Sequence, residues 1–164
     1  MMTGGKQIKG LIKSFRFALR GILFCLKNER NMRIHCCTVV LVSAFALIYG
    51  LSSLEFAVLF ITMSFVVVCE MVNTAIESLV DLQTSAYADL ARIAKDVAAG
   101  AVFVAAVCSV VCGVAMFFRF PKFAVVLAHI FTTPYIIIPF VLYVIFAVLF
   151  VFKGFEMFKF KKLK

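Results

Sequence analysis

Four polar side chains recur at helical spacing within and just beyond an apolar stretch of this chain. They are Glu70, Asn73, Glu77 and Asp81. At about 100° per residue, a helix places the last three within roughly 60° of Glu70, on one face. Carboxylates at membrane depth cost about 2.5–3.5 kcal/mol each, so they must face protein, water or a cation. The spacing therefore predicts a stripe of oxygen ligands suited to a divalent metal ion.

The composition is that of an integral membrane protein and excludes an ordinary soluble domain. Hydrophobic residues make up 65% of the chain, charged residues only 15%, and the mean hydropathy is +1.11. A helix needs about 20 residues to cross the hydrocarbon core of a bilayer. We expect an all-α integral membrane fold, with an N-terminal amphipathic surface helix, three core transmembrane helices and an extra C-terminal transmembrane helix. The uncharged stretches cover residues 36–54, 56–69, 97–118 and 123–152.

The second uncharged stretch, residues 56–69, is too short to cross a bilayer alone. At 1.5 Å per residue it covers roughly 21 Å of a hydrocarbon core about 30 Å thick. The helix must therefore continue through Glu70 and Asn73 before it leaves the membrane. This places Glu70 below the membrane surface.

The distribution of the seventeen Lys and Arg residues indicates the orientation of the chain. They gather in residues 6–33, in the loop at residues 81–95 and in the tail from residue 153, and these segments are expected on the cytoplasmic side. Arg119 and Lys122 fall on the outer side and are an exception. An even number of crossings satisfies this arrangement and places the acidic stripe at the cytoplasmic end.

The first thirty residues alternate apolar and basic side chains with the period of a helix. Between Ile8 and Leu26, lysines and arginines fall between the apolar positions, which predicts an amphipathic helix on the inner leaflet. Two roles are open for this helix. It anchors the chain to anionic lipid, or it also covers a site at which nucleotide phosphates arrive.

Two polar segments each have two interpretations. Glu29, the sole acid among residues 27–35, either pairs with Arg33 at i,i+4 or meets Glu77 and holds a cation with it. Lys95, which precedes Asp96, either anchors its helix at the membrane interface or receives a phosphate.

The remaining apolar segments indicate packing rather than chemistry. Small residues at 3,4 spacing on the third crossing predict a close helix contact. In the last stretch, Pro134 and Pro139 favour one tilted or kinked crossing from about residue 133 to 152, with residues 123–131 in the outer interface. The small residues are Ala91, Ala94, Ala98, Ala101, Ala105, Cys108, Cys112 and Ala115.

The sequence has no P-loop, no G-x-G-x-x-G turn and no protein-kinase catalytic loop. It nevertheless holds the groups that phosphoryl transfer needs: carboxylates for a divalent ion, cations for developing charge and a base. Glu70, the deepest carboxylate, suits a base that takes the proton of a lipid hydroxyl, because desolvation raises its proton affinity.

Four runs of the chain resemble the prokaryotic diacylglycerol kinase family, and its undecaprenol kinase branch most. They are SFRFALRG at 14–21, ERNMRIH at 29–35, EMVNTAIE at 70–77 and AKDVAAGAV at 94–102. The resemblance covers about residues 6–118. It implies a kinase domain at 1–118 and an extension at 119–164 with a fourth membrane helix and a basic tail. The extension lacks the His and Arg motifs of the lipid phosphatase found there in some relatives.

This resemblance implies a multi-pass enzyme of the bacterial inner or plasma membrane, with its N-terminus and active site cytoplasmic. It implies a homotrimer that binds no nucleic acid, uses ATP with Mg²⁺, and phosphorylates undecaprenol or diacylglycerol. Glu70 would be the catalytic base, and Glu29 and Glu77 would hold the metal. The other residues expected to bind or orient the nucleotide are Phe17, Asn73, Ala86, Tyr87, Ala88, Lys95 and Asp96.

A small cation- or proton-coupled transporter is the alternative function. It would use the same buried carboxylates as its ion site and would need no ATP. That interpretation gives no reason for Lys95 and Asp96 at the cytoplasmic end. Protection of Lys95 from acylation by nucleotide would separate the two.

Overall fold

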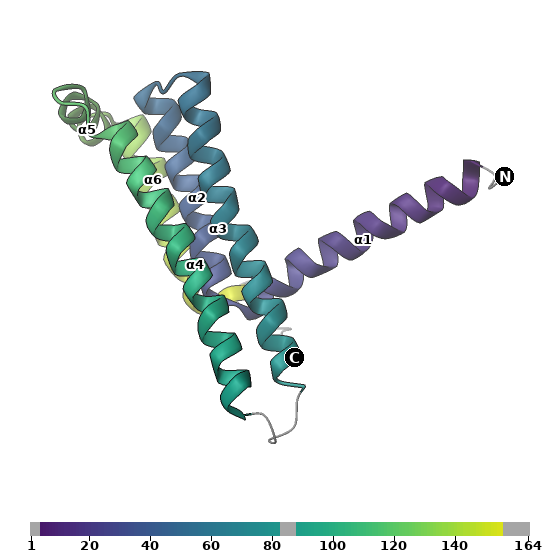
Figure 1. Ribbon diagram of the computed structural model, residues 1–164. Helices are drawn as coiled ribbons and strands as arrows, with labels where there is room; N and C mark the ends of the chain where they lie inside the picture. Colours follow the sequence, from purple (N-terminus) through teal and green to yellow (C-terminus); the bar gives the residue numbers. More distant parts are fainter. Residues whose placement is uncertain (1–3, 83–87, 156–164) are drawn as a thin grey trace, which may run out of the picture.

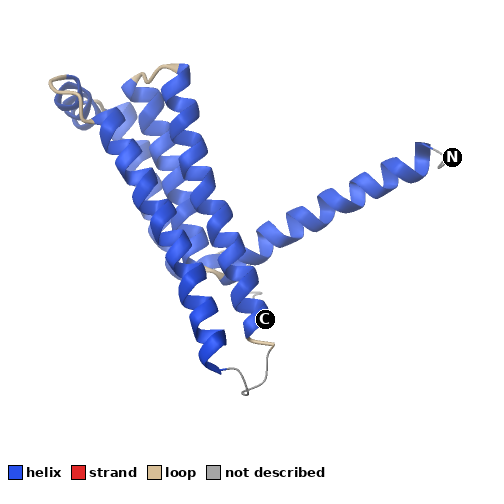
Figure 2. Cartoon of the chain, viewed as in Figure 1, coloured by secondary structure: helices blue, strands red, loops and turns tan. Residues whose placement is uncertain are grey.

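The computed structural model describes residues 4–82 and 88–155, and within them all regular secondary structure is helical, joined by short loops (Figure 2). Four helices, α2, α3, α4 and α6, are long and apolar enough to cross a membrane. The expected all-α fold is thereby confirmed, with four helices that could cross a membrane by their length and composition. The helices are α1 (Gly4–Asn28), α2 (Arg30–Tyr49), α3 (Ser53–Val80), α4 (Ala88–Phe117), α5 (Lys122–Thr132) and α6 (Pro134–Lys153).

The four long helices lie side by side as a bundle, from which α1 projects to one side (Figure 1). Helix α3 makes its most extensive contact with α4 and also packs on α2, whereas α6 packs on α2. Near the middle of α3, Val66 is buried against Val102 and Ala105 of α4. Because lipid is as apolar as these side chains, close packing rather than exclusion of water holds the helices together.

The connection between α2 and α3 is built from two standard helix ends. Gly50 adopts a left-handed conformation (φ 69°), and its N–H donates to the carbonyls of Ala46 and Leu47. Ser52 then caps α3: its Oγ accepts from the Glu55 N–H, and the Glu55 carboxylate accepts from the Ser52 N–H. This reciprocal capping box explains why α3 begins abruptly at Ser53.

Arg119 and Lys122, the two basic residues that depart from the positive-inside pattern, have partners at the same end of the bundle. Arg119 forms an ion pair with Glu55. Lys122 lies 4.4 Å from the centre of the Tyr49 ring and donates to the Gly50 carbonyl at 3.3 Å. These partners give Arg119 and Lys122 a structural role that does not depend on which side of the membrane they face.

The small-residue face of α4 is used only in part. Ala98 and Ala105 are buried against α3, whereas Ala101, Cys108 and Ala115 are exposed. The contact stripe runs through positions 98, 102 and 105, so it is centred beside the predicted face rather than on it. Within this chain the predicted close contact therefore uses Ala98 and Ala105, and the three exposed members take no part in the contact with α3.

The last apolar stretch divides as its prolines predicted. Helix α5 ends at Thr132, Thr133 is extended, and Pro134 occupies the first turn of α6. Proline is favoured in a first turn because it has no N–H to leave unpaired. A single crossing from residue 134 follows, with α5 folded across one end of the bundle (Figure 1).

Helix α1 extends the predicted amphipathic helix by a few residues at each end. Its large apolar side chains, including Ile8, Leu11 and Phe15, are exposed and contact no other helix of this chain extensively. Such a face is typical of a helix that lies on a membrane surface.

Candidate functional site

The polar stripe of α3 points into the bundle near its middle and leaves it toward the end of the helix. Glu70 is 1% exposed and Asn73 is 7% exposed. Glu77 is half-buried, and Asp81, the C-cap residue of α3, is exposed. The side-chain amide of Asn73 donates to Glu77 Oε1 at 2.9 Å, so these two residues share one face as their spacing predicted.

The junction of α1 and α2 carries Glu29 to this stripe. Glu29 is the single residue between the two helices, it is extended (φ −98°, ψ 121°), and its side chain makes no capping hydrogen bond. In the α2–α3 hairpin, Glu29 and Asn73 lie equally far along the chain from Leu51. Since both helices rise 1.5 Å per residue, this register places Glu29 at the depth of Asn73, between Glu70 and Glu77.

The carboxylates of Glu29, Glu70 and Glu77 therefore lie near enough to interact electrostatically, and none of them forms an ion pair in the described part of the chain. Those of Glu29 and Glu77 both act electrostatically on Glu70. Among the described residues, no lysine, arginine or histidine forms an ion pair with any of the three. A proton or a nearby cation would relieve the repulsion between like charges in a partly dehydrated site.

The i,i+4 ion pair between Glu29 and Arg33, one of the two interpretations of Glu29, does not form in the described structure. Arg33 instead donates to three main-chain carbonyl oxygens, those of Leu26, Lys27 and Val151. The guanidinium is held by these carbonyls, and the Glu29 carboxylate stays free for another cation.

The donor set suits a metal that arrives with its substrate rather than a resident one. No group of three or more His, Cys, Asp or Glu side chains in the described residues is arranged to hold a metal by itself. Mg²⁺ commonly binds one or two carboxylates and completes its shell with phosphate and water oxygens. The buried Oδ1 of Asn73, which has no hydrogen-bond partner, adds an unused acceptor to this set.

Lys95 and Asp96 lie on the first turns of α4, near the end of the acidic stripe. Lys95 forms an ion pair with Asp81, and it also interacts electrostatically with Glu77. The pair is solvent-exposed and hence weak, so an arriving phosphate can displace Asp81 from Lys95. Asp96 is exposed and makes no hydrogen bond or ion pair within the described residues.

A groove of about 730 Å³ runs between α1 and α3, and no carboxylate is among the described residues that line it. Phe17 and Arg20 contribute to its α1 wall, and Thr74 and Ser78 to its α3 wall. The centre of the Phe17 ring lies 5.7 Å from Arg20 Cζ and 5.6 Å from Lys13 Nζ. Apolar walls with cations at the edge are the surroundings that an amphiphile with a phosphate group requires.

Thr74 and Cys25 belong to this region although their sequence patterns gave no functional signal. Thr74 is buried and donates to the Glu70 carbonyl at 3.0 Å. Cys25, on the last turns of α1, is 5% exposed. Burial raises the pKa of the Cys25 thiol, the Glu29 and Glu70 carboxylates raise it further, and Thr74 acts in the opposite direction. The sequence offered one positional clue for Thr74: it lies four residues after Glu70, and therefore on the same face of the helix.

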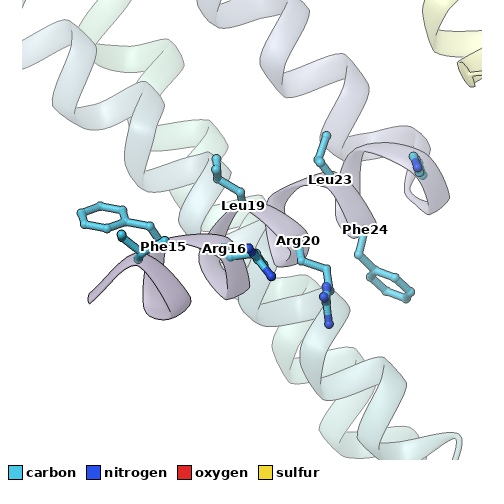
Figure 3. Close-up of a pocket in the computed structure, with 8 residues that line it drawn as sticks. Phe15, Arg16, Leu19, Arg20, Leu23 and Phe24 are labelled. Carbon is cyan, nitrogen blue, oxygen red and sulfur yellow. The ribbon is translucent and has the colours of Figure 1, made fainter. Parts of the chain in front are cut away.

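A second hollow, of about 710 Å³, follows α1 itself (Figure 3). Its walls include Phe15, Arg16, Leu19 and Arg20, and every residue that lines it comes from α1. Because it contains no acid and involves no second helix, we assign it to the face of an amphipathic helix rather than to a reaction site.

Part of the expected nucleotide site cannot be placed. Ala86 and Tyr87 lie outside the described residues, and Ala88 is the first residue of α4 with only its backbone described.

Comparison with known proteins gives a match over most of the helical core. The model of the family described as prokaryotic diacylglycerol kinase matches residues 16–117, which include Glu29, Glu70 and Glu77. A diacylglycerol kinase of Synechocystis sp. is 44% identical over 104 residues, which are 63% of this chain and 59% of that relative. No solved structure matches significantly.

Two further relatives are covered almost completely by the match. An undecaprenol kinase of Bacillus subtilis is 38% identical over 111 residues, 68% of this chain and 90% of the relative. A diacylglycerol kinase of Haemophilus influenzae is 28% identical over 109 residues, 66% of this chain and 92% of the relative. The matched core ends at α4, so α5 and α6 lie beyond it.

Proposed function

Because the chain belongs to the prokaryotic diacylglycerol kinase family, we propose that it transfers the γ-phosphate of ATP to the hydroxyl group of a membrane lipid, undecaprenol or diacylglycerol. The single observation that best supports this reaction is the electrostatic interaction of Glu29 and Glu77 with Glu70, in a set of carboxylates that forms no ion pair within the described residues. The kinase core is assigned to residues 1–118, and residues 119–164 form an extension.

In this proposal Glu29 and Glu77 hold the Mg²⁺ that accompanies ATP, and Asn73 fixes the orientation of the Glu77 carboxylate. When bound there, Mg²⁺ would neutralise negative charge on the phosphates. Carboxylate and amide oxygens are the ligands that Mg²⁺ prefers, so the residues present fit this ion.

Glu70 is the proposed catalytic base. Its carboxylate takes the proton of the lipid hydroxyl while the lipid oxygen forms a bond to the γ-phosphorus. The bond from that phosphorus to the β–γ bridging oxygen breaks, and ADP leaves with that oxygen. Burial of Glu70 within membrane-spanning α3 suits a substrate whose hydroxyl stays close to the bilayer.

The remaining residues act on the nucleotide. Lys95 would move from Asp81 to a phosphate of ATP, and Asp96 would orient the nucleotide. Phe17 would approach it from α1, and the segment Ala86–Ala88 would line its base. The enzyme would work as a homotrimer in the bacterial inner or plasma membrane, with this end of the bundle in the cytoplasm.

Phosphorylation of lipid by the purified protein tests this function. Detergent-solubilised protein, labelled ATP and Mg²⁺ are incubated in parallel with undecaprenol and diacylglycerol, and the lipid extract is counted. We expect labelled lipid monophosphate from the wild type, and none from Glu70→Gln, which should still bind nucleotide. Undiminished labelling by Glu70→Gln would remove the base assignment, and no labelling by the wild type would remove the kinase.

A further inference from the structure

Arg33 joins three segments of the chain at the α1–α2 junction. It is 8% exposed, and its Nη1 donates to the carbonyls of Leu26 at 3.2 Å and Lys27 at 3.1 Å. Its Nε donates to the carbonyl of Val151 at 3.3 Å. The first two acceptors belong to the last turn of α1, and the third belongs to the last turn of α6.

The bonds to α1 constrain the position of Glu29. The last carbonyls of a helix have no partner within that helix, and a cation there satisfies them and interacts favourably with the helix dipole. Arg33 supplies this cap from the first turn of α2, and Glu29 is the only residue between the helices. The guanidinium therefore fixes the angle of the junction that holds Glu29 beside Glu70.

The end of α6 fits closely around the same guanidinium. Gly154 is buried with φ 54°, a conformation that other residues rarely adopt. A Cβ at this position would lie 3.3 Å from Arg33 Nη1. Next to it, the Phe155 ring lies 5.6 Å from Lys27 Nζ, on the last turn of α1.

A second polar contact holds α6 in register with α2. The Tyr143 hydroxyl donates to the Cys37 carbonyl at 2.6 Å. Figure 1 shows the end of α6, in yellow, beside the α1–α2 junction. The family match ends at residue 117, so the acceptor on Val151 and the close approach of Gly154 belong to the extension and not to the matched core.

We propose that the C-terminal end of α6 holds Glu29 in place through Arg33, so that Arg33 and Gly154 are positioning residues for the carboxylate site. The extension is then a working part of the enzyme and not a passive membrane anchor. The effect on Mg²⁺ rests on the proposed kinase function, whereas the effect on the α1–α2 junction does not.

The test is Gly154→Ala, and Gly50→Ala is the control for alanine at a glycine with positive φ that is remote from Arg33. Both glycines have positive φ, and no atom lies within 4 Å of a Cβ at Gly50. The backbone of Gly50 is left-handed (ψ 54°), which alanine can adopt at a modest cost, whereas the backbone of Gly154 (ψ −142°) lies outside that region, so alanine strains the end of α6 more. We expect Gly154→Ala to raise the Mg²⁺ concentration for half-maximal lipid phosphorylation several-fold. Gly50→Ala should leave that concentration unchanged.

A second readout does not require activity. The other five cysteines are replaced by alanine, and the rate at which a maleimide labels Cys25, buried at the end of α1, is measured in full-length protein. A junction loosened by Gly154→Ala should label Cys25 several-fold faster than either the parent or the Gly50→Ala variant.

The two readouts separate the possible failures. If Gly154→Ala labels Cys25 no faster than Gly50→Ala does, or leaves the Mg²⁺ requirement of an active enzyme unchanged, the positioning role is overturned. If the wild type phosphorylates no lipid, the proposed function fails, and the labelling rates alone decide whether α6 holds the junction.

Discussion

The amide of Asn73 donates a hydrogen bond to the carboxylate of Glu77, from Nδ2 to Oε1 across 2.9 Å on successive turns of α3. The bond selects one orientation of the Glu77 side chain. It also leaves the buried Asn73 Oδ1 without a partner in the described structure. Asn73 therefore holds the Glu77 carboxylate in one orientation and offers its own Oδ1 as a free acceptor. Both lie close to the depth at which the α2–α3 register places Glu29.

Replacement of Asn73 by alanine should weaken the metal site without removing a carboxylate. Groups that orient a metal ligand typically contribute 10- to 100-fold to metal affinity or activity. We expect a rise of this size in the Mg²⁺ concentration for half-maximal activity, measured at saturating lipid. Thr62→Ala, on the same helix with its hydroxyl bonded to the Leu59 carbonyl, should show no such rise. Equal Mg²⁺ requirements in the two variants would contradict the role of Asn73.

Mg²⁺ should stabilise the wild type more than Glu77→Gln. The three carboxylates have no ion-pair partner among the described residues, so a bound cation relieves their repulsion. A ligand at 100 times its Kd stabilises the folded state by about 2.7 kcal/mol. Melting curves followed by circular dichroism, with and without Mg²⁺, measure this effect. Asp89→Asn removes an exposed acid of α4 and is the control. An equal Mg²⁺-induced shift in Glu77→Gln and the wild type would exclude Glu77 as a ligand.

The acidic stripe and the four crossings were predictable, because periodicity and apolar length are local properties of the sequence. Predicting that Glu29 approaches Glu70 needs one more step. Two antiparallel helices with equal rise per residue bring together positions that are equally far from Leu51 along the chain. The partners of Arg33 were not predictable. Spacing suggested Glu29, but the guanidinium reaches the carbonyl of Val151, and no local pattern marks so distant an acceptor.

The contact face of α4 shows a similar limit. Small residues predicted the helix that packs closely, but the packed stripe passes through Val102 rather than Ala101. The two positions differ by about 100° around the helix, and a pattern of small side chains is too broad to decide between them. The partner helix decides, here through Val66 of α3.

Lys95 should contribute to nucleotide affinity and not only to interface anchoring. Lys95→Gln removes a cation that a phosphate would use, and we expect the KM for ATP to rise at least tenfold. Asp81→Asn removes the partner that competes for Lys95, and should lower the KM for ATP. Initial rates at varied ATP and saturating Mg²⁺ provide both values. An unchanged KM in Lys95→Gln would favour the anchoring interpretation.

Cys25 should react slowly with maleimides, and at a higher pH than an exposed thiol. The thiolate is the reactive form, and burial with the nearby Glu29 and Glu70 carboxylates raises the pKa of Cys25. In a variant with no other cysteine, the labelling rate should be at least tenfold below that of Ser14→Cys, an exposed position on the same helix. Its rate should also keep rising with pH after that of Ser14→Cys has levelled off. Equal rates and equal pH profiles would show that α1 does not hold Cys25 against α3.

Substitutions at the α2–α3 connection should lower the stability of the protein and leave its chemistry intact. Ser52→Ala removes the Oγ that accepts from the Glu55 N–H, so one N–H in the first turn of α3 loses its partner. Loss of such a cap costs about 0.5–2 kcal/mol. We expect Ser52→Ala to melt at a lower temperature than Ser53→Ala, whose side chain makes no capping bond, while both keep the wild-type KM for ATP. The carboxylate site lies along α3 from this turn, at the other end of the α2–α3 hairpin, so a changed Mg²⁺ requirement in Ser52→Ala would mean that the two ends of α3 are coupled.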